Sequence, residues 1–169
     1  LLHSYLNPMH ENAVATIFSE VAPTIEIVRS SVVLPESREY ERTLATALNA
    51  CLIPVLQSHL EGLVKSPSAA PQIWLMQSNG GLASSTSLTQ QPLSTALSGP
   101  GAAVVGMRWL GETSGYENLI TLDVGGTSTD VAVIKDARYS LTTSGEVAGF
   151  PIKMPMLDVL SIGAGGGSI

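Results

Sequence analysis

The most constraining feature of this sequence is the run LDVGGTSTDV at residues 122–131. The apolar residues 119–124 predict a strand that carries Asp123 near its C-terminal end. Gly125 and Gly126 follow and predict a tight turn whose amide N–H groups no side chain obstructs. A second apolar stretch at 131–134 predicts the next strand. The pattern therefore indicates two strands joined by a glycine turn that carboxylates flank.

This strand–turn–strand unit predicts phosphate chemistry. Bare amides and the hydroxyls of residues 127–129 suit phosphate oxygens, and the Asp123 and Asp130 carboxylates suit Mg²⁺ or an attacking water. A β-hairpin in which the glycines only permit a bend is the alternative. Such a turn needs neither an aspartate before it nor hydroxyl residues and an aspartate after it, so we favour a phosphate-handling loop.

Three further motifs are candidates for binding. Ser98-Gly99-Pro100-Gly101 opens a predicted helix, where free amides and the helix dipole hold anions, although an ordinary helix start explains it equally well alone. The turn at residues 78–81 follows a predicted strand, where α/β proteins place ligands. The glycines of residues 162–168 indicate a close backbone approach to a ligand or a strand, with a flexible tail as the alternative.

The remaining elements follow from periodicity and from glycine and proline positions. We expect helices from Asn7-Pro8 to residue 21, over 36–64 with a Pro54 kink near Ala50, and over 102–110 with Ser98 or Gly99 as cap. Strands are expected at 25–33, 73–76 and 139–143. Loops are expected at 66–71 and at 111–117, and we place a lobe boundary in the second of these loops. The apolar face of the long helix is expected to comprise Tyr40, Leu44, Leu48, Cys51, Leu52, Val55 and Leu63.

Composition narrows the class of protein. Hydrophobic residues make up 44% and charged residues 13%, which is typical of a packed α/β protein and argues against a disordered chain. The chain opens at Leu1 without an initiator Met and closes on glycines, so we expect an internal piece of a longer protein.

Charge, cysteine content and histidine positions argue against several kinds of partner and site. The net charge is -6 and no Lys/Arg stripe is present, which argues against nucleic acid. Cys51 is the single cysteine, so no internal disulfide forms and a reducing compartment is expected. No apolar run suggests a membrane span. The three histidines lie on different predicted elements, which argues against a histidine metal site.

The motifs together resemble the hydantoinase A/5-oxoprolinase family in order and spacing. The matching segments are PESREYER at 35–42, Asn49-Ala50, QSNGG at 77–81, LSGP at 97–100, LDVGGTSTDV at 122–131 and IGAGGGSI at 162–169. The resemblance implies an α/β, partial actin-like (ribonuclease-H-like) ATPase fold. Residues 1–115 would form the end of the first lobe, and residues 116–169 the opening β-strands of the second.

The resemblance also implies an activity. Family members use ATP and Mg²⁺ to open cyclic amides such as 5-oxoproline or hydantoins by phosphorylating the amide oxygen, and relatives carboxylate ketones. Asp123 would position Mg²⁺, and Asp123 and Asp130 would be catalytic. The phosphate-binding residues would be Gly125, Gly126, Thr127, Thr129, Ser98, Gly99, Gly165 and Gly166.

The resemblance extends to partners. We expect a cytoplasmic protein that binds a cyclic amide, the remainder of its own chain and a second, hydantoinase B-type subunit or domain. A further Asp-x-Gly-Gly-Thr loop typical of the family is absent here, so we expect no turnover by these residues alone. A ketone carboxylase, a small-molecule kinase of the same superfamily and an inactive scaffold module are the alternatives, and the paired Asp123 and Asp130 argue against the last.

Overall fold

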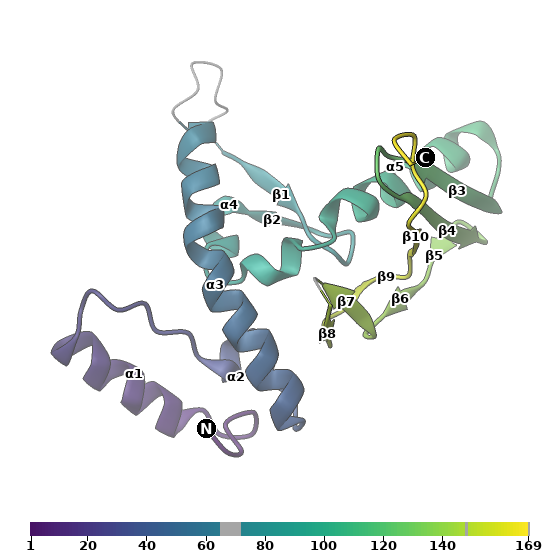
Figure 1. Cartoon of the computed structure of the whole chain (residues 1–169). Helices are drawn as coiled ribbons and strands as arrows, with labels where there is room; N and C mark the ends of the chain where they lie inside the picture. The colour runs from purple at the N-terminus through teal and green to yellow at the C-terminus, as the bar shows by residue number, and fades with distance from the viewer. Residues whose placement is uncertain (65–71, 148, 169) are drawn as a thin grey trace. The chain divides into compact units, whose positions relative to one another are not determined.

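The computed structural model describes residues 1–64, 72–147 and 149–168. The chain is a mixture of helices and short antiparallel strands, which confirms the predicted α/β class (Figure 1). It forms two compact units, which comprise residues 1–74, 84–93 and 144–154 in unit 1, and residues 75–83, 94–143 and 155–169 in unit 2. The predicted lobe boundary at 115/116 concerns the full-length protein and stays a prediction. The predicted loop at 66–71 lies outside the described residues.

Unit 1 is mainly helical (Figure 1). Its elements are α1 (Met9–Val21), α2 (Ser30–Val33), α3 (Glu39–Val64), α4 (Ser85–Leu88) and the hairpin of β7 (Gly145–Val147) with β8 (Phe150–Ile152). Helix α1 begins one residue after the predicted position, and the Asn7 side chain accepts a hydrogen bond from the Met9 amide at 3.0 Å. Helix α3 runs through Pro54, and the predicted kink stays a prediction.

The buried face of α3 differs from the predicted one. Its buried residues are Arg42, Ala45, Asn49, Ile53 and Leu60, which recur three, four or seven residues apart. Tyr40 and Val55 of the predicted face are 67% and 63% exposed, and Cys51 is exposed rather than in the core. The sequence prediction failed because it ranked positions by apolarity. The side that packs carries Arg42 and the amide of Asn49, both bound to polar partners inside the unit.

The predicted strand at 25–33 is wrong. Residues 25–29 are not in a strand, and Ser30–Val33 form the helical turn α2. The cause is distant in sequence. The Glu11 carboxylate accepts hydrogen bonds from the Ser30 hydroxyl at 2.6 Å and from the Ser31 amide at 2.9 Å. A carboxylate bound to the first amides of a helix stabilises that helix against the extended form that β-branched residues favour.

Unit 2 is built on an antiparallel sheet. Its strands are β3 (Leu119–Val124), β4 (Thr129–Lys135), β5 (Arg138–Tyr139) and β10 (Leu160–Ile162), in the order β10-β4-β3, with β5 also paired to β4. Strands β6 (Leu141–Thr142) and β9 (Met156–Leu157) pair separately, so the predicted strand at 139–143 is broken in two. Asp136 and Ala137, both with positive φ, form the tight turn between β4 and β5.

Helix α5 (Ser98–Ser114) covers one face of this sheet through Val104, which joins Ala132, Ile134 and Leu157 in a buried cluster. The predicted loop at 111–117 is wrong in its first half, because the helix continues to Ser114. It ends at Gly115, whose φ is 81°. A Cβ on Gly111 would lie 2.8 Å from the Tyr116 carbonyl oxygen, so this glycine permits close packing rather than ending the helix.

The start of α5 also differs from the prediction. Neither Ser98 nor Gly99 is the cap; the cap position is Leu97, whose amide donates to the Ser78 hydroxyl at 3.1 Å. Ser78 lies in the predicted turn at 78–81, which joins β1 (Trp74–Met76) to β2 (Leu82–Ser84). A short helical turn, η1 (Pro92–Thr95), precedes α5.

One helix of the described residues is long and apolar enough to cross a membrane by length and composition, namely Glu39–Leu63 of α3. The prediction that no apolar run suggests a membrane span missed this stretch, because charged residues open it and Pro54 interrupts it. A single such helix is weak support for a membrane span, since core helices of soluble proteins meet the same criterion. In unit 1, α3 packs on α2 and β8.

Candidate functional site

The predicted carboxylates lie in one row across the sheet of unit 2. Asp123 of β3 is directly opposite Asp130 of β4, and Asp130 is directly opposite Ser161 of β10. Residues paired in this way point to the same face of an antiparallel sheet. The Ser161 hydroxyl donates a hydrogen bond to the Asp130 carboxylate. Asp123 is exposed and has no hydrogen-bond or ion partner among the described residues.

This row has an energetic cost. Two like charges directly opposite each other destabilise a sheet by a few tenths of a kcal/mol up to about 1 kcal/mol. Stability alone therefore does not explain why two carboxylates, Asp123 and Asp130, lie opposite each other. The Ser161 hydroxyl stabilises the charge of Asp130 by a hydrogen bond. The Asp123 carboxylate has no such donor in the described part of the chain and is free to bind a ligand.

The loop between β3 and β4, residues 125–128, is called here the first glycine loop. It is closed by a hydrogen bond from the Gly125 amide to the Ser128 carbonyl, 2.8 Å long. The amides of Gly126 and Thr127 have no acceptor among the described residues, and both residues are exposed. A Cβ built on Gly126 would meet nothing within 4 Å. The loop therefore offers two adjacent N–H donors, and the chain is open on the Cβ side of Gly126.

Residues 164–168, called here the second glycine loop, dock on the first. The Gly166 amide donates to the Gly125 carbonyl at 2.9 Å, and the Gly167 amide donates to the Gly126 carbonyl at 2.8 Å. The sequence prediction of a close backbone approach is confirmed, and the partner is the first glycine loop. The alternative of a flexible tail is not what the structure has, since these residues form a turn closed by a hydrogen bond from the Ser168 amide to the Gly165 carbonyl.

The predicted phosphate ligands fall into two groups. Gly125, Gly126, Thr127 and Thr129, with Gly165 and Gly166, come together at the end of the sheet formed by β3, β4 and β10. Within this group Thr129 is already engaged, because its hydroxyl donates to the Ala164 carbonyl at 2.5 Å. The Gly165 amide donates to the Ser168 hydroxyl at 3.0 Å.

Ser98 and Gly99 form the second group. Their helix start packs on the β1–β2 turn, where a Cβ on Gly101 would lie 3.3 Å from the Leu157 side chain and 3.6 Å from the Ser78 carbonyl. Ser78 itself is buried and donates to the Ser94 carbonyl at 2.8 Å. None of the described hydrogen bonds joins this region to the first glycine loop. Their role as phosphate ligands stays a prediction.

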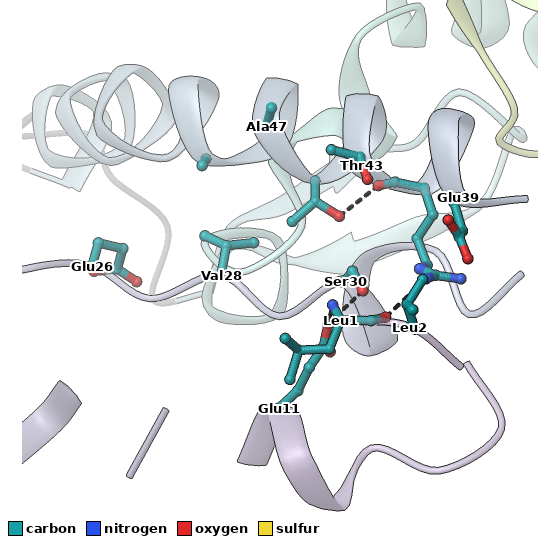
Figure 2. Close-up of a pocket in the computed structure, with 12 residues that line it drawn as sticks. Leu1, Leu2, Glu11, Glu26, Val28, Ser30, Glu39, Thr43 and Ala47 are labelled. Atoms are coloured by element: carbon teal, nitrogen blue, oxygen red, sulfur yellow. Dashed lines mark hydrogen bonds and ion pairs between the residues drawn. The ribbon is translucent and has the colours of Figure 1, made fainter. Parts of the chain in front are cut away.

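Unit 1 contains a polar cluster around Glu11 that the sequence analysis missed (Figure 2). Burial of Glu11 raises the pKa of its carboxyl, but hydrogen bonds from Ser30 and Ser31 outweigh burial and hold the pKa at about 2. The Ser30 hydroxyl also lies 3.1 Å from that of Ser4. The cluster borders a cavity of about 660 Å³ that Arg42 also lines. The sequence signal that could have found it is Glu11 itself, an acid early in a predicted helix with no Lys or Arg before Arg29.

The carboxylate of Glu11 is satisfied inside the protein. Both of its oxygens accept hydrogen bonds from the Ser30–Ser31 segment, and the guanidinium of Arg42 donates to the carbonyls of Glu36 at 2.7 Å and Leu1 at 3.0 Å. Groups that are hydrogen-bonded within the chain contribute to stability, and both oxygens of Glu11 are used in this way. We therefore regard the Glu11 cluster as structural.

Comparison with known proteins agrees with the motifs. The profile of the hydantoinase/oxoprolinase family matches residues 42–169. The alpha subunit of a caprolactamase from Pseudomonas jessenii is 33% identical over 98% of this chain, and a 5-oxoprolinase from Pestalotiopsis fici is 35% identical over 99%. The chain spans 24% of the first relative and 13% of the second.

Solved structures show the same relationship. The crystal structure of the ATP-dependent caprolactamase from Pseudomonas jessenii superposes on 98% of this chain with a TM-score of 0.83 and 32% identity, and 24% of that protein is covered. An acetone carboxylase in its nucleotide-free state superposes on 98% with a TM-score of 0.79 and 30% identity, again over 24% of its own length. The fold of this chain thus recurs inside larger ATP-dependent enzymes.

Proposed function

The chain belongs to the hydantoinase/oxoprolinase family, and from this premise we propose that its full-length protein hydrolyses a cyclic amide at the expense of ATP. The observation that carries the proposal is the first glycine loop, which presents the free amides of Gly126 and Thr127 beside the unpartnered carboxylate of Asp123. Adjacent backbone donors of this kind bind phosphate oxygens.

The residues of the site fit ATP phosphates. The Gly126 and Thr127 amides would donate to phosphate oxygens, and the Thr127 hydroxyl is a further donor. Space on the open side of Gly126 allows a ligand to reach the backbone. In such reactions most of the catalysis consists of positioning and of stabilising charge on the transferred group.

The carboxylates fit Mg²⁺ of the kind that accompanies ATP. Mg²⁺ is usually held by one or two carboxylates together with substrate phosphates and water. No group of three or more His, Cys, Asp or Glu side chains that could hold a metal by themselves occurs among the described residues. Asp123 would hold the ion, and Asp130, fixed by Ser161, would orient the reacting groups. The ion would offset negative charge on the phosphates.

ATP-dependent carboxylation of a ketone is the second candidate. It is favoured by the acetone carboxylase superposition, whose TM-score of 0.79 is close to the 0.83 of the caprolactamase. Both reactions would use the same phosphate loop, so the geometry of residues 123–130 does not separate them. The substrate would contact other parts of the full-length protein.

We extend the proposal to partners and location. The caprolactamase relative is an alpha subunit, which favours a second subunit for this protein as well. A reducing, cytoplasmic location is part of the proposal, and the exposed free thiol of Cys51 supports it.

The test is ATP turnover by the full-length protein with 5-oxoproline, hydantoin, caprolactam, acetone or a sugar, with bicarbonate present as the carboxyl source for acetone. We expect a cyclic amide to stimulate phosphate release and Asp123→Asn to reduce kcat by 100-fold or more, roughly 3 kcal/mol of transition-state stabilisation. Asp158→Asn is the matched control, an exposed carboxylate of the same unit whose backbone amide is bound to Ser140. Stimulation by acetone alone would establish the carboxylase, and full activity of Asp123→Asn would overturn the site.

A further inference from the structure

The contacts between the two glycine loops use carbonyl groups of the first loop. Gly166 and Gly167 donate to the carbonyls of Gly125 and Gly126, respectively, at 2.9 and 2.8 Å. A trans peptide unit is planar, with its C=O and N–H pointing in opposite directions. Fixing the Gly125 carbonyl therefore aims the Gly126 amide away from the second loop, and fixing the Gly126 carbonyl does the same for the Thr127 amide.

The approach of the two backbones is as close as glycine permits. A Cβ on Gly165 would lie 2.6 Å from the Gly126 carbonyl carbon and 2.6 Å from the Thr127 nitrogen. Gly165 does not have a positive φ, so the requirement for glycine comes from space and not from backbone conformation. The nearby Gly163 differs, because a Cβ there would meet nothing within 4 Å.

Thr129 ties the second loop to the strand that follows the first. Its hydroxyl donates to the Ala164 carbonyl across 35 residues of sequence. Thr129 and Ile162 are the last pair of the β4–β10 ladder, so the hydrogen bond from Thr129 to Ala164 lies just beyond the end of that ladder. The proton of the Thr129 hydroxyl is therefore already donated to a group of the protein itself.

We propose that the second glycine loop is a positioning element that orients the Gly126 and Thr127 amides for phosphate, and that Thr129 is its latch. The inference deepens the proposed function and rests on it. It assigns Thr129, Gly165 and Gly166 to positioning, through the first loop, in place of direct contact with phosphate. The free donors for the ligand are those of Gly126 and Thr127.

The test compares Gly165→Ala with Gly163→Ala in the full-length protein. The added methyl of Gly165→Ala must displace the first loop, so we expect the KM for ATP to rise at least tenfold while the KM for the cyclic amide changes little. Gly163→Ala adds the same methyl in open space and should keep the wild-type KM for ATP. Equal KM values for ATP in the two variants would overturn the proposal.

Thr129 provides a second test that does not depend on a crowded position. Thr129→Val removes the hydroxyl at nearly constant volume and should raise the KM for ATP several-fold, and Thr129→Ser, which keeps the hydroxyl, should restore it. A direct phosphate ligand would also be rescued by serine, so amide hydrogen exchange in the absence of ATP makes the distinction. Thr129→Val should speed exchange at Gly166 and Gly167, and unchanged exchange there would contradict the latch.

The proposed function and the positioning role of the second glycine loop can be contradicted independently of each other. A wild-type protein that neither binds nor uses ATP would end the proposed function. Hydrogen exchange without nucleotide would still report whether Gly165→Ala, and not Gly163→Ala, opens the bonds to Gly125 and Gly126. Faster exchange in both variants, or in neither, would refute the loop contact as the cause.

Discussion

The two polar clusters of this chain use carboxylates in opposite ways. In unit 1, Glu11 is buried and both of its oxygens accept hydrogen bonds from Ser30 and Ser31. In unit 2, Asp123 is exposed, faces another carboxylate and has no partner among the described residues. The first arrangement stabilises the fold, whereas the second costs stability and leaves groups available for a ligand.

The glycines show the same contrast. Gly80 and Gly115 have positive φ and allow turns that other residues rarely adopt. Gly125, Gly126 and Gly165 do not have positive φ, although Gly125 and Gly126 do form the predicted tight turn, which the Gly125–Ser128 hydrogen bond closes. Gly165 is needed because two backbones approach each other there, and Gly126 leaves open the side of the chain where phosphate is proposed to bind. In this chain, a glycine whose φ is not positive therefore says more about close contacts and ligand access than a glycine that a turn requires.

The largest stability effect is expected at Glu11. Glu11→Ala removes the acceptor for the Ser30 hydroxyl and Ser31 amide, and we expect the free energy of local unfolding around α2 to fall by about 2 to 3 kcal/mol. Hydrogen exchange of the α1 and α2 amides measures it, with the exposed acid Glu20→Ala as control. The KM for ATP should not change. A loss of ATP binding with intact α2 would remove the distinction between the two clusters.

The same cluster should respond to pH. The pKa of Glu11 is lowered from 4.5 to about 2, so its ionised form stabilises the fold above pH 4.5 and this contribution is lost as the pH falls from 4.5 to 2. The stability difference between the wild type and Glu11→Gln should therefore shrink over that interval. Hydrogen exchange of α2 at pH 5 and pH 2.5 tests this, and a constant difference would contradict an ionised Glu11.

The smallest effect is expected at the carboxylate pair. Asp123→Asn removes the repulsion with Asp130 and should leave stability unchanged or raise it by up to about 1 kcal/mol, while activity is lost. Thermal unfolding of the sheet, compared with Asp158→Asn, measures the change. A loss of more than 1 kcal/mol would mean that Asp123 has a structural role.

Parts of this picture could be predicted from the sequence. The strands around the first glycine loop, the long helix and the close approach of residues 162–168 follow from local patterns, and the structure confirms them. The helical turn at Ser30–Val33 could not be predicted, because Glu11 stabilises it from another element. The buried face of α3 was mispredicted, because Asn49 is buried by its bonds to Gln90 and Leu93 and not by apolarity.

About half of the candidate site could be predicted from the sequence. The sequence identified Asp123, Asp130 and the glycines, since the motif carries them together. It did not indicate that Ser161 holds Asp130 or that Thr129 binds Ala164, because these contacts join residues that are 31 and 35 positions apart. Only the pairing of β10 with β4 brings them together.

The most direct test of the central claim is amide hydrogen exchange of the full-length protein with and without MgATP. We predict that ATP slows exchange in residues 125–128, at the Gly126 and Thr127 amides, and leaves the Ser30 and Ser31 amides beside Glu11 unchanged. Unchanged exchange at 125–128 with ATP bound, or protection only at the Glu11 cluster, would contradict the assignment of the first glycine loop as the phosphate site.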